Sequence, residues 1–113
     1  MRTEHMNKNR HEQSLQYALK VLKSSIFSPY IKKIYLYGSY ARKEQNYQSD
    51  VDLLIFITES TPTQMIAKMR HAVISEDYTL PEVELKFTKS DRFSSSYQFN
   101  KNIERDAILL WEK

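Results

Sequence analysis

The sequence contains one glycine and no cysteine among its 113 residues. Average glycine usage near 7% would give about eight glycines in this length. Both the P-loop and the dinucleotide-binding fingerprint require several, so those two phosphate-binding motifs are excluded. Any phosphate site must therefore be built around Gly38 alone. The lack of cysteine means that nothing suggests a disulfide framework or secretion.

Long apolar runs are also missing. No stretch approaches the ~20 apolar residues that span a bilayer, and the opening MRTEHMNKNRHEQ lacks the apolar core of a signal peptide. These features predict a cytoplasmic protein without a membrane segment. A length of 113 residues, with 41% hydrophobic and 27% charged residues, predicts one globular domain over residues 1–113.

The charge balance is mildly basic. Seventeen Lys and Arg residues against fourteen Asp and Glu residues give a net charge of +3. This excess favours polyanionic ligands such as nucleotides or RNA without requiring them.

Apolar spacing predicts alternating helices and strands. Helical periodicity and helix-start residues indicate helices over 13–27, 63–75 and 90–106. Runs of β-branched, aromatic or alternating residues indicate strands over 34–37, 51–58, 82–88 and 107–111. This order predicts an α/β or α+β fold, with a mixed sheet of about four or five strands flanked by helices.

Two aspartates stand at the start of the strand expected over 51–58. Asp50 and Asp52 are two residues apart, so their carboxylates project from the same face of the sheet. The opposite face is a row of apolar side chains, namely Val51, Leu53, Ile55 and Ile57. Neighbouring carboxylates repel, and a divalent cation is the usual compensation. Oxygen ligands of this kind suit Mg²⁺.

A third carboxylate is available on the strand expected over 82–88. Its alternation places Glu82 and Glu84 on one face, and either of them could supply the group. Three carboxylates match the charge of two Mg²⁺ ions that phosphate oxygens neutralise further. Two such ions stabilise the attacking and leaving oxygens of an in-line displacement at phosphorus.

The segment GSYAR places the only glycine between a strand and an expected helix start. Gly38 lets the backbone turn without a Cβ and brings N–H groups towards a phosphate. The hydroxyl of Ser39 can donate to a phosphate oxygen, and Arg42 can add a charge-assisted contact. Lys43 can add a less specific positive charge near the same phosphate. A lone Gly-Ser is usually only a turn, so the combination with the aspartates carries the inference.

GSYAR followed by SDVD, with ten residues between Gly-Ser and Asp50, resembles the signature of the minimal nucleotidyltransferases of the polymerase-β-like superfamily. VELKFTKSDRF is similar to the family strand that carries the third carboxylate, and IERDAILLWEK is similar to the family's C-terminal end. The resemblance covers most of the chain after Ile34.

The resemblance implies Mg²⁺-dependent transfer of a nucleoside monophosphate from an NTP, with ATP preferred, to an acceptor hydroxyl. By position, Gly38 and Ser39 hold the triphosphate, while Asp50 and Asp52 bind two Mg²⁺ ions. Glu84 is the third acidic ligand and is favoured over Glu82 by its place in VEL. Small proteins of this kind are commonly paired with a helical HEPN-domain toxin, to which the nucleotidyltransferase, as antitoxin, adds AMP on a tyrosine.

The sequence departs from the family pattern at two positions. Lys43 stands where the family usually has glycine, and Glu84 stands where it more often has aspartate. Neither change removes a functional group, so an active site is expected.

Other functions and assemblies stay open. A non-catalytic antitoxin that neutralises a helical partner by contact is the alternative, and an apolar patch on the first or last helix would favour it. Direct RNA binding is supported only by the mild positive charge. Homo- and hetero-oligomers are both compatible with the sequence.

The histidines and two tyrosines are interpreted without a role in metal binding. His5, His11 and His71 have no ligand spacing among them and are interpreted as surface residues. Tyr40 and Tyr47 flank the expected site and are candidates for stacking on a base.

Overall fold

The computed structural model describes residues 10–89 and 97–113. Its centre is a four-stranded mixed sheet in the order β3-β2-β1-β4. Strand β1 (Ile31–Tyr37) is antiparallel to both β2 (Val51–Ile57) and β4 (Ile108–Glu112), whereas β3 (Val83–Thr88) is parallel to β2. The predicted α+β class and the mixed sheet of about four strands are confirmed.

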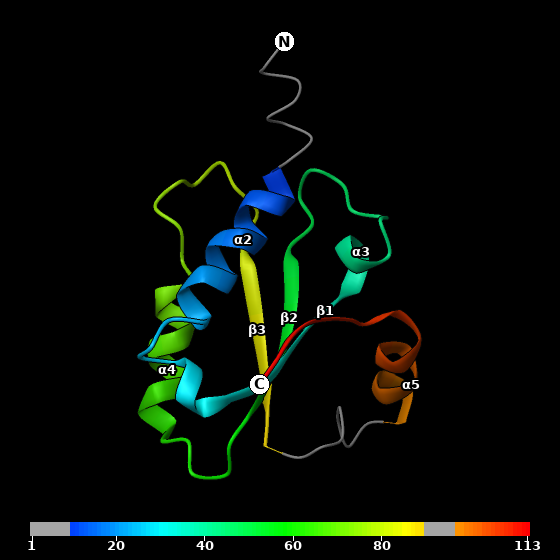
Figure 1. Cartoon of the computed structure of the whole chain (residues 1–113). Helices are drawn as coiled ribbons and strands as arrows, with labels where there is room; N and C mark the ends of the chain where they lie inside the picture. Colours follow the sequence, from blue (N-terminus) through cyan, green and yellow to red (C-terminus); the bar gives the residue numbers. More distant parts are fainter. Residues whose placement is uncertain (1–9, 90–96) are drawn as a thin grey trace.

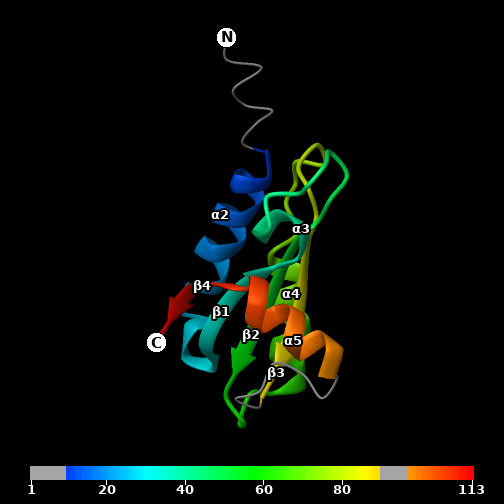
Figure 2. The ribbon, with the colours of Figure 1, turned by 90° about the vertical axis from the view of Figure 1, so that its right-hand side faces the viewer.

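Helices cover both faces of this sheet (Figures 1 and 2). One face packs against α2 (Arg10–Leu22) and α4 (Thr63–Ala72), and the other packs against α5 (Tyr97–Asp106). The short helix α3 (Gly38–Ala41) follows β1, and a 3₁₀ turn, η1 (Ser28–Tyr30), precedes it. Within the described ranges, no helix has both the length and the apolar character needed to cross a bilayer.

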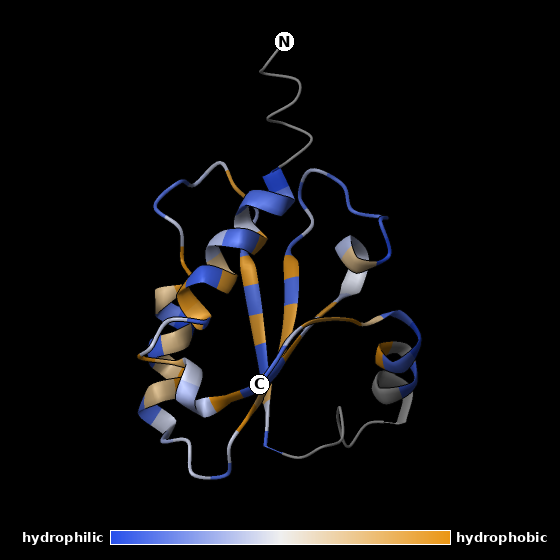
Figure 3. Ribbon diagram, viewed as in Figure 1, coloured by the Kyte–Doolittle hydropathy of each residue, from blue (hydrophilic) through white to orange (hydrophobic). Residues whose placement is uncertain are grey.

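The two faces of β2 account for the layers. Its odd-numbered residues join the core beneath α2 and α4, as the apolar row in the sequence predicted. Leu54 and Phe56 form a smaller core with Ile103 of α5 on the opposite face. Figure 3 shows the alternation of apolar and polar positions along β2 and β3. Asp52 therefore lies on the same face as Leu54 and Phe56, at the amino end of β2.

Several predicted element ends are wrong by a few residues. The first helix ends at Leu22 instead of Phe27, because Ser24 accepts the N–H groups of Phe27 and Ser28 in a tight turn. Ile26, predicted to lie on the apolar stripe, is consequently exposed. Helix α4 ends at Ala72 and β1 begins at Ile31. The predicted helix over 90–106 is present over Tyr97–Asp106, and residues 90–96 lie outside the described residues.

Strand directions place the candidate site at one end of the sheet. Because β1 is antiparallel to β2 and β3, its carboxyl end meets their amino ends. Tyr37 lies opposite Asp52, and Asp52 lies beside Glu84. Residues from three separate parts of the sequence thus meet at this end of the sheet.

Candidate active site

Gly38 follows β1 and starts α3 with a φ of +81°. This left-handed backbone is accessible to glycine but strained for other residues. A Cβ built at this position would lie 3.1 Å from Cγ of Asp52 and nearer still to its Oδ2. Glycine is therefore required at this position for two reasons: the backbone is left-handed, and the Asp52 carboxylate leaves no room for a Cβ.

Lys43, two residues after the end of α3, adopts a second left-handed conformation, with a φ of +61°. The N–H of Glu44 donates to the carbonyl of Ser39, and that of Lys43 donates to Tyr40. These two bonds form the Schellman arrangement that closes many helices and usually carries glycine at the left-handed position. Lys43, which stands where the family usually has glycine, thus lies just after the end of α3 and introduces backbone strain there.

Asp50, Asp52 and Glu84 form an acidic cluster in which one carboxylate oxygen from each lies within 4.8 Å of the others. Asp52 and Glu84 are neighbours in the parallel register of β2 and β3. Asp50 immediately precedes β2, whose first N–H donates to the carbonyl of Glu82. The structure thus brings together the three carboxylates named from the sequence and places Glu84, not Glu82, in the cluster.

Burial and neighbouring negative charge both act on the Asp52 carboxyl. The pKa of Asp52 is raised to about 6, first by burial and then by the charges of Glu84 and Asp50, while Lys86 opposes the shift. Burial raises the pKa of the Tyr37 phenol, and the negative charges of Asp52 and Glu84 raise it further. A cation among these oxygens would relieve the repulsion, so the donor set fits a divalent metal such as Mg²⁺.

A small cavity of about 170 Å³ adjoins the cluster. Its lining includes Asp50 and Glu84, together with Glu82 and Arg70. Arg70 donates to the carbonyl of Leu85 at 2.7 Å and lies over the ring of Phe87. Arg70 was not predicted from the sequence, because no local pattern relates a helix residue to a strand residue fifteen positions later.

The remaining predicted phosphate ligands lie on or next to α3. Ser39 is half-buried in its first turn. Arg42 follows the helix, and its guanidinium pairs with Glu44 at 2.9 Å and with Asp106 at 3.8 Å. Its two acidic partners are not members of the acidic cluster. Contact between Arg42 and a phosphate would therefore compete with these two ion pairs.

His11 contradicts its interpretation as a surface residue. Its side chain is only 6% exposed, and its Nε2–H donates to the carbonyl of Ser49 at 2.9 Å. The ring also packs on Tyr40, with centroids 5.3 Å apart. His71 is exposed as predicted, and His5 lies outside the described residues. The missed signal is a contact between residues far apart in sequence, which no local pattern reports.

The two tyrosines considered for base stacking are already engaged. The hydroxyl of Tyr40 donates to Glu12 at 2.8 Å, and burial together with this hydrogen bond raises the pKa of Tyr40 to about 12. The guanidinium of Arg10 covers the ring of Tyr47 at 3.7 Å from its centroid.

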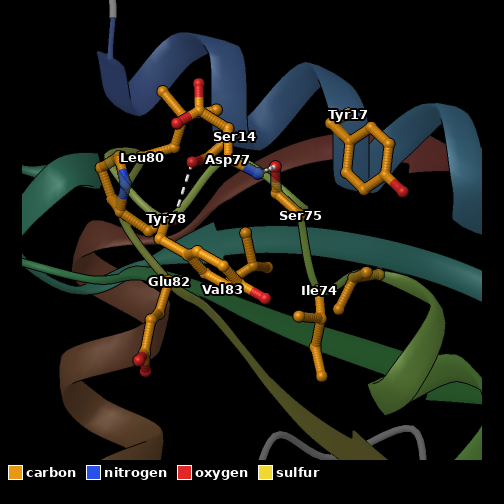
Figure 4. Close-up of a pocket in the computed structure, with 11 residues that line it drawn as sticks. Ser14, Tyr17, Ile74, Ser75, Asp77, Tyr78, Leu80, Glu82 and Val83 are labelled. Atoms are coloured by element: carbon orange, nitrogen blue, oxygen red, sulfur yellow. Dashed lines mark hydrogen bonds between the residues drawn. The ribbon is translucent and has the colours of Figure 1, made fainter.

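A larger cavity of about 400 Å³ lies between α2, the α4–β3 connection and the start of β3 (Figure 4). Three of its lining residues are exposed aromatic or aliphatic side chains, namely Tyr17, Ile74 and Tyr78. Glu82 and Val83 line both this cavity and the small acidic one. An apolar surface thus begins next to the acidic cluster.

Comparison with known proteins relates this geometry to a family. Residues 20–113 match the family described as polymerase beta, nucleotidyltransferase. No curated protein matches the chain.

Three solved structures share the fold. A chain from a toxin–antitoxin with AMP-PNP has a TM-score of 0.62 and 21% identity, covering 87% of this chain and 73% of that chain. A mutant of the toxin–antitoxin MntA–HpeT has a TM-score of 0.61 and 20% identity, covering 84% of this chain and 70% of that chain. A candidate nucleotidyltransferase from Sulfolobus solfataricus has a TM-score of 0.51 and 18% identity, covering 88% of this chain and 87% of that chain. These likenesses show the fold, and the family match over residues 20–113 shows that the chain belongs to the polymerase beta nucleotidyltransferase family.

Proposed function

We propose that this protein is a Mg²⁺-dependent adenylyltransferase that moves AMP from ATP to a hydroxyl group of a protein partner. The observation that carries the proposal is the meeting of three carboxylates within 4.8 Å, against a turn where no side chain fits. Such a cluster is costly for the fold unless it serves a ligand, because its like charges repel.

The residues of the cluster fit two Mg²⁺ ions, which would be held by Asp50, Asp52 and Glu84. When bound, the ions would neutralise charge on the triphosphate and on the oxygens that attack and leave the α-phosphorus. Gly38 lets the turn lie against Asp52 without a side chain, and the Ser39 hydroxyl donates to an oxygen of the triphosphate. Both residues orient the triphosphate.

The reaction requires a proton acceptor next to the acceptor hydroxyl. The hydroxyl oxygen forms a bond to the α-phosphorus, the bond to the β-phosphate oxygen breaks, and pyrophosphate leaves. Glu84 is exposed at the start of β3, where an incoming hydroxyl has access, so its carboxylate takes the hydroxyl proton.

The partner assignment rests on similarity to toxin–antitoxin structures and on the resemblance of the GSYAR and SDVD segments to minimal nucleotidyltransferases. We propose a helical HEPN-type toxin as the acceptor and one of its tyrosines as the modified group, with this protein acting as the antitoxin. The apolar surface next to the acidic cluster supports a protein acceptor over a free small molecule.

The test is transfer of label from ATP. The protein is incubated with Mg²⁺ and the product of the neighbouring gene, using α-labelled ATP in one reaction and γ-labelled ATP in the other. Adenylyl transfer predicts label on the partner only from the α position, and loss of that label in Asp52→Asn. Glu59→Gln is the matched control, because Glu59 is an exposed carboxylate beyond the other end of β2. Absence of α-label transfer by the wild-type protein would refute the proposal.

A second candidate function is neutralisation of the partner by contact alone. The exposed Tyr17, Ile74 and Tyr78 around the larger cavity favour it, because apolar patches mark interaction surfaces. Neutralisation that survives Asp52→Asn but is lost in Tyr78→Asp would support this function over catalysis.

A further inference from the structure

The first two turns of α2 hydrogen-bond to three segments that adjoin the acidic cluster. The Nε2–H of His11 donates to the carbonyl of Ser49, which immediately precedes Asp50. The carboxylate of Glu12 accepts a hydrogen bond from the hydroxyl of Tyr40, two residues after Gly38. One short stretch of helix thus holds both the aspartate loop and the glycine turn.

The same turns hold the loop that leads to Glu84. Arg10 donates from Nη2 at 2.6 Å and from Nε at 3.0 Å to the carbonyl of Thr79, while its Nη1 donates to the carbonyl of Tyr47 at 3.1 Å. The hydroxyl of Ser14 donates to the carbonyl of Pro81 at 2.7 Å. Arg10 therefore links the two loops that deliver Asp50 and Glu84.

These contacts have the pattern of a positioning device. Four of the accepting groups are main-chain carbonyls, namely those of Tyr47, Ser49, Thr79 and Pro81, so the bonds fix the path of the backbone rather than a side chain. The His11 ring is buried while it makes its bond, and burial strengthens the requirement for the hydrogen-bond partner. Residues 10–14 also precede the part of the chain that matches the family, which starts at residue 20.

We infer that Arg10, His11 and Ser14 are positioning residues that set the separation of Asp50 from Glu84, and thereby the affinity of the site for a divalent cation. This inference rests on the proposed metal-dependent function. It follows from geometry: Asp50 ends the loop before β2, Glu84 lies in β3 just after the loop 73–82, and the helix hydrogen-bonds to the backbone of both loops. Groups that orient metal ligands typically change metal affinity or activity by about ten- to a hundredfold when removed.

The test measures binding of Mg²⁺ alone by calorimetry, with adenylyl transfer as a second readout. In His11→Ala the Ser49 carbonyl loses its donor, and we expect Mg²⁺ affinity to fall about tenfold or more. His11→Gln keeps an N–H donor at similar reach and should restore most of that affinity. Leu19→Ala is the control, because Leu19 packs in the core further along the same helix. It should lower the melting temperature without changing Mg²⁺ affinity at temperatures where the protein is folded.

Arg10→Ala keeps the inference testable if His11→Ala does not fold, because the Arg10 bonds are exposed. It should weaken Mg²⁺ binding and lower kcat more than it raises the KM for ATP. Amide hydrogen exchange should rise in both loops, 43–50 and 73–82. Unchanged Mg²⁺ affinity in folded His11→Ala or Arg10→Ala overturns the inference and leaves the proposed function standing. Wild-type protein that binds no Mg²⁺ overturns both.

Discussion

Removing the charge of Asp52 should stabilise the metal-free protein. The pKa of this carboxyl is raised from 3.8 to about 6, so the folded state holds its proton more tightly than the unfolded state does. The resulting cost to folding is fully present above pH 6, shrinks as the pH falls through 6, and vanishes below about 3.8. Asp52→Asn keeps the shape of the side chain and removes this cost.

The size of the effect follows from the shift. One pKa unit corresponds to 1.36 kcal/mol, so a shift of about two units sets an upper limit of about 3 kcal/mol. Asp52 is half-buried and solvent screens part of the interaction, which leaves about 1 to 2 kcal/mol. For a domain of this size, each kcal/mol changes the melting temperature by roughly 4 °C. Asp52→Asn should therefore melt about 4 to 8 °C above the wild-type protein at pH 8.

Thermal unfolding in the presence of a chelator measures this difference. Its size should fall to about half at pH 5, where most of the folded wild-type protein already carries the proton. Adding Mg²⁺ at pH 8 should raise the melting temperature of the wild-type protein more than that of the variant, because only the wild type keeps all three carboxylates. A variant that melts at or below the wild type at pH 8 without metal would refute the reasoning, since the carboxylate would then stabilise the fold.

Three further changes have defined outcomes. Gly38→Ala should lose Mg²⁺ and nucleotide binding, measured by calorimetry, because its Cβ displaces Asp52. It should also lose about 1 to 2 kcal/mol of stability in urea unfolding, because alanine is strained in the left-handed backbone. Unimpaired binding would contradict the assigned role of the turn. Lys43→Gly should gain about 0.5 to 1 kcal/mol in urea unfolding, because glycine tolerates a φ of +61°, whereas Lys43→Ala should gain nothing; equal gains would exclude the backbone explanation. Ile103→Ala should cost about 2 to 5 kcal/mol in the same assay, because Ile103 fills the small core between α5 and β2, and a cost below 1 kcal/mol would mean that α5 packs loosely.

The sequence was informative wherever a short period or a fixed spacing determined the outcome. The alternation along 51–57 and 82–88 correctly placed Asp52 and Glu84 on the face opposite Val51, Leu53 and Leu85, because residues two apart on a strand share a face. It did not show that Leu54 and Phe56, on the same face as Asp52, are buried against Ile103. The end of α2 at Leu22 was missed, because main-chain hydrogen bonds to the carbonyl of Ser24 form a turn where the apolar stripe would have continued the helix.

Contacts between distant segments could not be predicted from the sequence. His11 reaches Ser49 and Arg70 reaches Leu85 only after the helices have packed on the sheet. A lone histidine at a helix start has the same local pattern whether its ring is buried or exposed. The sequence thus predicted the members of the acidic cluster, and the residues that support them became visible only in the folded chain.

The close approach of Gly38 to Asp52 also limits the motion of the carboxylate. Because the main chain of the turn lies against this side chain, little room is left for rotamers that would swing it towards the turn. The conformational entropy of Asp52 is therefore lost when the chain folds rather than when a cation arrives. A site ordered in advance in this way can bind and release its metal with little rearrangement of the protein.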